Sequence, residues 1–397
     1  MGFPSLTRSE IQPASRASSD VPGDALVIAI DVMGGDHGPA VTVAGAAIAL
    51  KRRPDLFFQL HGDPLLINPV LARHPELKAR ATVVETDQFI AMDEKPAQAI
   101  RRRNTSLANA IHAVKAGEAK AAVSAGNTGA LMALSKMILK MITHDLERPA
   151  IGCLWPNAKG YSTVLDVGAN VTSDARQLIE FAMMGAAFHR AVKGVDKPSI
   201  GLLNIGSEDV KGHEEVREAH RLLRDNAFGL DYYGFVEGTD LCAGTVDVIV
   251  TDGFTGNVAL KTAEGTARFI RDLLRGALKS SPLAMLGALL AAPALKAMAK
   301  KVDPGASNGG PLLGLNGVVI KSHGGADARA YANAIAVAAS LAGSGYAREL
   351  ESSLALLTRS LADGDGDGGL AVTGNDTNIE AKTPAVMAVA ETENKVS

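Results

Sequence analysis

The sequence predicts an α/β fold in three layers, α/β/α, around a mostly parallel sheet. Five short apolar runs support this, and they are nearly continuous, as strands buried on both faces are. The runs cover residues 26–31, 121–126, 162–168, 200–206 and 246–253. Helical patterns separate them, at 40–51, 97–116, 174–192 and 213–225. Alternation of this kind predicts βαβ units, with helices on both faces of the sheet.

The 397 residues divide into one predicted domain and two tails. Residues 1–24 are rich in Ser, Pro and charge, and residues 361–397 begin with Asp-Gly alternation. Such segments cannot bury enough apolar surface to fold, so both are expected to be disordered. Residues 25–360 form the expected folded domain, with a helical hairpin at about 266–302.

The overall charge does not point to a polyanionic partner. The formal net charge is −3, so nucleic acid is not an expected partner, and any attraction to an acidic surface must be local. The two cysteines have no CxxC spacing, which is typical of a protein from the reducing cytoplasm.

Polar, glycine-rich segments follow the apolar runs. In open parallel sheets the carboxyl ends of the strands meet at one edge, where ligands bind. These six segments are DVMGGDHGP (31–39), SAGNTGA (124–130), DVGAN (166–170), NIGSEDVKG (204–212), DGFTGN (252–257) and SHGG (322–325). Glycine lets the backbone approach a ligand, and amide N–H groups and helix starts attract anions. The segments therefore predict a pocket for a small tetrahedral anion, with charge available from Lys211, Lys261 and Lys321.

Other interpretations of these segments are weaker. Gly, Asn and Asp also form ordinary turns. Six such segments, each at the end of an apolar run, are hard to explain in that way. No GxxxxGK[ST] or GxGxxG pattern occurs, which argues against a nucleotide P-loop and a nicotinamide site. His213 and His220 suit a solvated helix face better than a metal site, and no GxSxG nucleophile is present.

Two surface features suggest partners. Residues 95–120 carry a basic stretch that includes Lys95 and Arg101 to Arg103, which suits either a solvated helix face or an acidic docking partner. Residues 273–302 contain no Asp or Glu before Asp303 and have an uncharged centre at 280–295, too short to span a bilayer. This segment predicts an amphipathic hairpin whose apolar tip could pack in the core, against a dimer partner or on a membrane.

Seven segments in order resemble one family, the bacterial phosphate acyltransferases called PlsX. They are IAIDVMGGDHGP, SAGNTGAL, LDVGAN, GLLNIGSEDVKG, VEGTD, DGFTGNVALKTAEG and LLGLNGVVIKSHG, spread over about residues 26–345. The resemblance implies conversion of long-chain acyl-[acyl-carrier-protein] and phosphate to acyl phosphate, early in phospholipid synthesis. It implies a fold similar to phosphotransacetylases and isopropylmalate dehydrogenases, and no metal or organic cofactor.

The same resemblance implies partners and a location. The partners expected are acyl carrier protein, a second copy of the chain, the membrane surface and a downstream membrane acyltransferase. The expected location is the cytoplasm, with peripheral association at the inner face of the cell membrane.

The expected site residues come from the strand-end segments. The catalytic ones are His37, Asn127, Lys211 and Lys261. The substrate-binding ones are Asp31, Gly34, Gly35, Asp36, Ser124, Gly126, Thr128, Asp166, Asn170, Asn204, Glu208, Asp252, Asn257 and His323. Among these, Asp31, Asp166 and Asp252 are expected to orient donors, because carboxylates repel phosphate. His37 and Lys211 are expected to move the proton.

Three rival functions remain open at this point. A phosphotransacetylase would use coenzyme A and a short acyl group. A non-catalytic scaffold would only bind acyl carrier protein. A metal-dependent hydroxy-acid dehydrogenase would need clustered carboxylates and a nicotinamide signature, and the sequence has neither.

Overall fold

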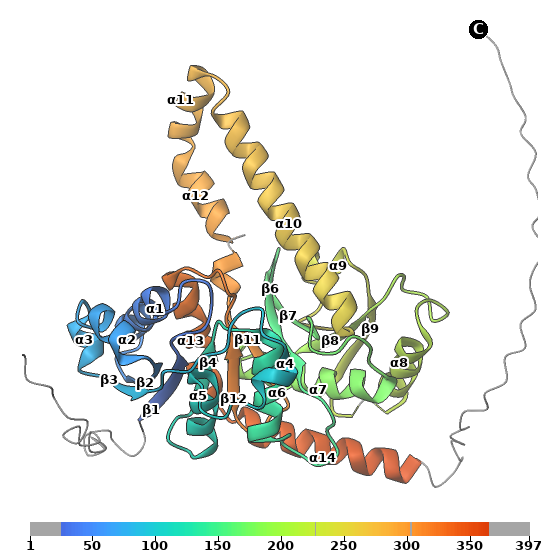
Figure 1. Ribbon diagram of the computed structural model, residues 1–397. Helices are drawn as coiled ribbons and strands as arrows, with labels where there is room; N and C mark the ends of the chain where they lie inside the picture. The colour runs from blue at the N-terminus through green and yellow to red at the C-terminus, as the bar shows by residue number, and fades with distance from the viewer. Residues whose placement is uncertain (1–24, 227, 302–303, 365–397) are drawn as a thin grey trace, which may run out of the picture.

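The computed structural model describes residues 25–226, 228–301 and 304–364, whose strands form two sheets (Figure 1). The first sheet has seven strands in the order β3-β2-β1-β4-β12-β11-β5. All of its strand pairs are parallel except those of β11 with β12 and β5. Its strands are β1 (Leu26–Asp31), β2 (Leu56–Gly62), β3 (Ala81–Glu85), β4 (Ala121–Ser124), β5 (Ala150–Ile151), β11 (Gly310–Leu313) and β12 (Val318–Lys321).

The second sheet has five strands in the order β6-β7-β10-β8-β9. Only β6 runs antiparallel to its neighbour. Its strands are β6 (Cys153–Asn157), β7 (Gly160–Leu165), β8 (Ser199–Leu203), β9 (Asp231–Val236) and β10 (Val248–Val250).

Helices cover both faces of the sheets. On the first sheet α1 and α13 pack together, as do α5 and α6, while α7 packs on β7 and β10 of the second. The helices are α1 (Pro39–Arg52), α2 (Pro64–Leu71), α3 (Pro75–Lys78), α4 (Pro96–Ala99), α5 (Ser106–Lys115), α6 (Thr128–Leu139), α7 (Ala175–Lys193), α8 (Glu214–Asn226), α9 (Asp240–Ala243), α10 (Gly253–Leu278), α11 (Pro282–Leu290), α12 (Ala292–Lys301), α13 (Ala328–Ala342) and α14 (Tyr346–Gly364), with a 3-10 turn at Pro304–Ser307.

Two buried apolar layers confirm the predicted three-layer arrangement. Alternate residues of a strand point to opposite faces, so Ile28 of β1 joins one layer and Ala29 the other. Each layer also takes residues from the second sheet: Val250 lies in the layer of Ile28, and Ile249 in that of Ala29. The two sheets therefore share both cores, although the sequence had predicted a single sheet.

The sequence located the buried strands better than their ends. Each of the five predicted runs contains a strand, but only the strand at 26–31 ends where predicted. The other four strands end two or three residues sooner, because the last residues of those runs already belong to the polar loops. The helix predicted at 97–116 is wrong as one piece, because residues 100–105 separate α4 from α5. The hydroxyl of Thr105 accepts a hydrogen bond from the N–H of Ala108 and so starts α5 anew.

The predicted hairpin is present and projects from the body of the molecule (Figure 1). It is longer than expected, because α10 begins at Gly253, directly after β10 and its loop. At about 1.5 Å per residue, its 26 residues span roughly 39 Å from the sheet edge to the tip. Of the helices described, none is long and apolar enough to cross a membrane.

The two predicted tails lie almost wholly outside the described residues. This holds for all of 1–24 and for 365–397. The helix α14 extends to Gly364, a few residues past the boundary drawn at 360.

Candidate functional site

The carboxylate of Asp31, at the end of β1, is the centre of the first group of loops. One oxygen accepts a hydrogen bond from the hydroxyl of Ser106 at 2.6 Å, and the other from that of Ser124 at 2.7 Å. The backbone N–H of Gly34 donates to it as well. Burial raises the pKa of Asp31, and these hydrogen bonds and the charge of Lys321 oppose that rise. Asp31 thereby ties β1, β4 and the start of α5 together.

Glycines let the loops after β1, β4 and β12 approach one another. A Cβ on Gly34 would lie 2.5 Å from Asp31 Oδ2 and 2.8 Å from the nitrogen of Gly126. Gly35 has φ of 90°, and a Cβ there would lie 2.8 Å from that of Ala125. The N–H of Asp36 donates to the carbonyl of Gly324 at 3.0 Å. Only glycine fits this approach, so the three predicted segments do meet.

Asn127 is the N-cap of α6, and its side chain is fully engaged. Its Oδ1 accepts from the N–H of Ala130 at 3.0 Å, and its Nδ2 donates to the carbonyls of Met92 at 2.8 Å and Glu94 at 2.9 Å. Asn127, predicted as a catalytic residue, therefore fastens the 92–94 segment to the start of α6. Thr128, the first residue of that helix, is exposed beside it.

A second group of loops forms around Asp166, after β7. Its carboxylate accepts from the backbone N–H groups of Ile151, Gly168, Ala169 and Asn170 at 2.6–3.1 Å, and from the Nδ2 of Asn170 at 2.9 Å. Burial raises the pKa of Asp166, and these donors oppose that rise. With its oxygens occupied by the chain's own donors, Asp166 shapes the loop rather than facing a ligand.

The start of α10 packs on this second group. Asp252 is its N-cap and accepts from the N–H of Thr255 at 2.8 Å. A Cβ on Gly253 would collide with the carbonyl oxygen of Asn170, and one on Gly256 with that of Asp166. Asn257 is exposed and faces Gly168, where a Cβ would lie 3.6 Å from Asn257 Oδ1.

The loop after β8 closes on itself. The Nδ2 of Asn204 donates to the carbonyl of Lys211 at 3.1 Å, and Gly212 passes so close to Asn204 that no side chain would fit. Glu208 and Lys211 are exposed. Because β8 neighbours β10, this loop emerges at the same edge as the second group.

The remaining predicted residues lie on the surface of the loops. Asp36 and His37 are exposed after β1. The ring Nδ1 of His323 accepts from the N–H of Gly325 at 3.2 Å, so this histidine orders its own loop. Lys261 is exposed and forms an ion pair with Glu264 at 2.9 Å, one turn further along α10.

The edge of the first sheet contacts the second group of loops. The strand β5 of the first sheet supplies the N–H of Ile151 to the carboxylate of Asp166. The positive charge of Lys261 on α10 lowers the pKa of Lys321 on β12, so α10 also acts electrostatically on the first group. The loops thus flank a common region between the sheets.

Two residues of the site were not among the predicted ones. Ser106 lies on a helix rather than in a strand-end loop, although the Thr105-Ser106 pair has the residue types of a helix start, which could have drawn attention to it. The sequence predicts Lys321 only as a possible source of charge, because its burial depends on the fold. Its pKa is lowered to about 8 by burial.

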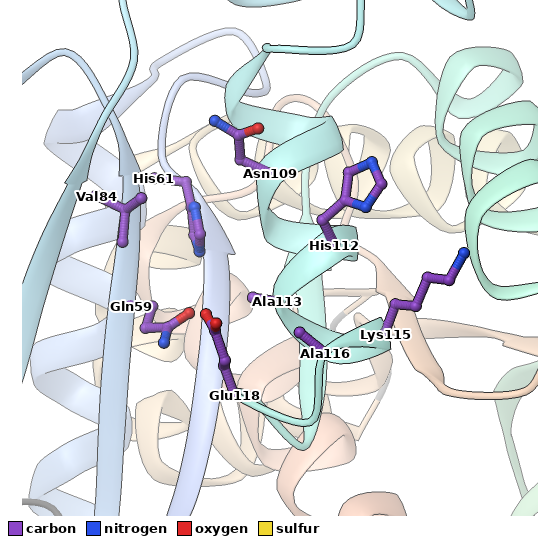
Figure 2. A pocket seen from close by; sticks show the side chains of 9 residues that line it. All are labelled: Gln59, His61, Val84, Asn109, His112, Ala113, Lys115, Ala116 and Glu118. Carbon is purple, nitrogen blue, oxygen red and sulfur yellow. The ribbon is translucent and has the colours of Figure 1, made fainter. Parts of the chain in front are cut away.

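A separate cavity of about 530 Å³ lies between β2, β3 and α5 (Figure 2). It contains none of the predicted site residues. Both ring nitrogens of His61 and the Oε1 of Gln59 are buried there without a hydrogen-bond partner in the structure. Burial lowers the pKa of His61 to about 4, so the ring is neutral at pH 7. Across the described ranges, no three His, Cys, Asp or Glu side chains gather as metal ligands would.

The chain is similar in sequence to a known family and to its curated members. The family model described as "Fatty acid synthesis protein" matches residues 26–349. A phosphate acyltransferase from Caulobacter vibrioides is 60% identical over 347 residues, covering 86% of this chain and 96% of that protein. One from Phenylobacterium zucineum is 55% identical over 338 residues, covering 85% of this chain and 96% of its own.

Solved structures share the fold at much lower identity. A phosphotransacetylase from Streptococcus pyogenes has a TM-score of 0.55 and 18% identity, covering 81% of this chain and 95% of its own. The EutD phosphotransacetylase from Staphylococcus aureus has a TM-score of 0.53 and 17% identity, covering 81% of this chain and 96% of its own. The predicted similarity to the phosphotransacetylase fold is confirmed, and that to isopropylmalate dehydrogenases stays a prediction.

Replacing Asp166 by Asn tests the role of this carboxylate in the second group. The amide would keep one acceptor oxygen and turn an NH₂ group toward backbone N–H donors, leaving buried donors unpaired. We expect a loss of about 3 kcal/mol in the free energy of unfolding, measured by denaturant titration. The control is Asp55→Asn, which breaks an exposed ion pair with Arg53 and should cost about 0.5 kcal/mol. An equal loss in both variants would contradict the role assigned to Asp166.

Proposed function

We propose that this chain takes its acyl group from a long-chain thioester of acyl carrier protein. The chain belongs to the family of fatty acid synthesis proteins, and it is an acyltransferase that works with phosphate in lipid synthesis. The product is then acyl phosphate. The observation that carries the phosphate part of this reaction is the meeting of three glycine loops at the ends of β1, β4 and β12, beside the start of α6. Backbone amides and a helix N-terminus suit an inorganic anion.

The proposed reaction is a direct transfer. A phosphate oxygen attacks the thioester carbonyl carbon, a C–O bond forms, and the carbonyl oxygen carries the developing negative charge. The C–S bond then breaks, and the thiolate takes the proton that the phosphate brought. A thiol has a pKa of about 8.5, which makes it a good leaving group without strong acid catalysis. Positioning and charge stabilisation supply most of the catalysis in such a step.

We assign phosphate binding to the backbone N–H groups of Gly35 and Thr128, in the loops after β1 and β4. Gly34 and Gly126 let these two loops approach each other, because their own N–H groups donate to Asp31 and to the Ser124 hydroxyl. Asn127 keeps these loops in place as the cap of α6 rather than donating to the oxyanion. Asp36, Ser124 and His323 complete the loop framework of this first group.

The second group, with Asn170, Asn204, Glu208, Asp252 and Asn257, is assigned to the acyl donor. Lys261 adds positive charge from α10. His37 and Lys211 remain the proposed groups for moving the proton, since both are exposed at the ends of strands.

Turnover of three thioesters tests the donor. Palmitoyl-carrier protein, palmitoyl-CoA and acetyl-CoA are compared for phosphate-dependent thiol release. We expect the highest kcat/KM for palmitoyl-carrier protein, because both the palmitoyl group and the carrier protein contribute contacts with the enzyme. A preference for acetyl-CoA would make the chain a phosphotransacetylase, and binding of carrier without any turnover would make it a scaffold.

The basic segment beside the site is the proposed docking surface for the acidic carrier. Arg101 and Arg103 are exposed, whereas Arg102 pairs with Glu94 at 3.0 Å. The segment is held against the first turn of α6 by Asn127 and by α4, whose Pro96 packs on Gly129. A carrier bound here would hold its thioester next to the glycine loops.

Reversing the charge of this segment should weaken binding of the carrier. We expect Arg101→Glu with Arg103→Glu to raise KM for palmitoyl-carrier protein roughly tenfold and to leave KM for palmitoyl-CoA almost unchanged. The matched control reverses Lys51 and Lys78, two exposed lysines on α1 and α3. Equal effects of the two double variants would place the docking surface elsewhere.

The hairpin is proposed to serve dimerisation and membrane contact, with peripheral association at the inner face of the membrane. Along α10, Phe254, Val258, Phe269 and Leu273 are exposed on one side, which suits packing against a second copy. At the tip, α11 has no buried residue, and Leu283, Leu289 and Leu290 are more than two-thirds exposed. A downstream membrane acyltransferase could receive the acyl phosphate there.

Placing a charge at the tip separates these two roles. We expect Leu286→Glu to reduce flotation with anionic vesicles several-fold while the dimer mass in light scattering stays the same. The control Ser280→Glu adds the same charge at an exposed polar position below α11. Unchanged flotation of Leu286→Glu would remove the membrane role and leave only dimerisation.

A further inference from the structure

Lys321 joins two of the three glycine loops of the first group. It is the last residue of β12 and pairs in register with Ser124 of β4, which in turn pairs with Asp31 of β1. Its Nζ donates to the carbonyl of Ala125 at 3.2 Å and to that of Ser322 at 2.5 Å. Two of its three N–H groups therefore hold the loops at 124–130 and 322–325 next to each other.

The charges around Lys321 come from three elements. Asp31 on β1 and Asp36 in the following loop favour its charged form, while Lys261 on α10 disfavours it. Burial is the larger effect and works against the charge. A cation in such a half-buried place interacts more strongly with an anion than the exposed Lys211 and Lys261 do, because less water screens it.

We propose that Lys321 is a positioning residue of the phosphate site, which clamps two glycine loops through their carbonyls and fixes a positive charge beside the bound phosphate. This inference rests on the proposed function. The role of Lys321 differs from that of Lys261, because the ammonium group of Lys261 forms an exposed ion pair with Glu264. With Asp31 holding the loop after β1, Lys321 completes the connection among the three loops.

The clamp has a defined pH dependence. The pKa of Lys321 is lowered to about 8, so the ammonium is present below that pH and is lost as the pH rises through it. Phosphate affinity of the native protein should therefore fall between about pH 7 and pH 9. The loops lose one hydrogen-bond donor and the fixed charge over the same range.

Two substitutions test the proposal by calorimetric titration with inorganic phosphate and by turnover of palmitoyl-carrier protein. We expect Lys321→Met to weaken phosphate binding roughly tenfold at pH 7, with a larger change in KM for phosphate than in kcat. Lys321→Arg keeps its charge at all accessible pH values, so it should bind phosphate within a few-fold of the native protein and show no decline up to pH 9. The control Lys51→Met removes an exposed lysine from the far end of α1.

The outcomes separate this inference from the proposed function. Native-like phosphate affinity in Lys321→Met, or an alkaline decline that persists in a folded Lys321→Arg, would overturn the role of Lys321. A native protein that binds phosphate but turns over no carrier thioester would contradict the proposed donor, and the binding data would still decide the role of Lys321. Circular dichroism and thermal unfolding of each variant show whether it folds.

Discussion

The hydrogen bonds accepted by one buried carboxylate, that of Asp31, hold together the part of the structure on which the site depends. Ser106 comes from α5, Ser124 from β4 and the N–H of Gly34 from the loop after β1. A buried carboxylate is costly unless such donors surround it, so each partner is needed to keep it in place. Asp31 therefore fixes where three chain segments meet, and the glycines allow them to meet closely.

The second sheet repeats this arrangement with Asp166. Its carboxylate accepts hydrogen bonds from the backbone N–H groups of its own loop and from that of Ile151 at the edge of the first sheet. The start of α10 packs directly on this loop, since neither Gly253 nor Gly256 leaves room for a side chain. The long hairpin thus begins at the site and ends at an exposed apolar tip (Figure 1). One element connects the proposed place of reaction with the proposed place of membrane contact.

Much of the fold could be predicted because buried parallel strands have nearly continuous apolar sequences. The strand at 26–31 was predicted with its exact bounds, and the helices at 40–51 and 174–192 to within a residue or two at each end. The division into two sheets could not be predicted, because it depends on pairing between distant segments such as β4 and β12. The break between α4 and α5 was missed, although Thr105 is a residue type that starts helices.

The candidate site was predicted as a set of loops but not as a set of roles. Glycine at strand ends indicated that the backbones would meet, which the contacts of Gly34 with Gly126 bear out in geometry. The sequence does not show that the amide of Asn127 donates its hydrogen bonds to the 92–94 segment. It also does not show that Lys321 is half-buried while Lys261 is exposed. Burial and hydrogen-bond partners depend on the whole fold, so residue type alone does not determine them.

A crystal structure of the protein with phosphate bound would show which loops hold the anion. We expect phosphate within hydrogen-bonding distance of the backbone N–H groups of Gly35 and Thr128, on the side of Lys321. Phosphate held only by the loops of the second sheet, around 166–170 and 204–212, would contradict this expectation.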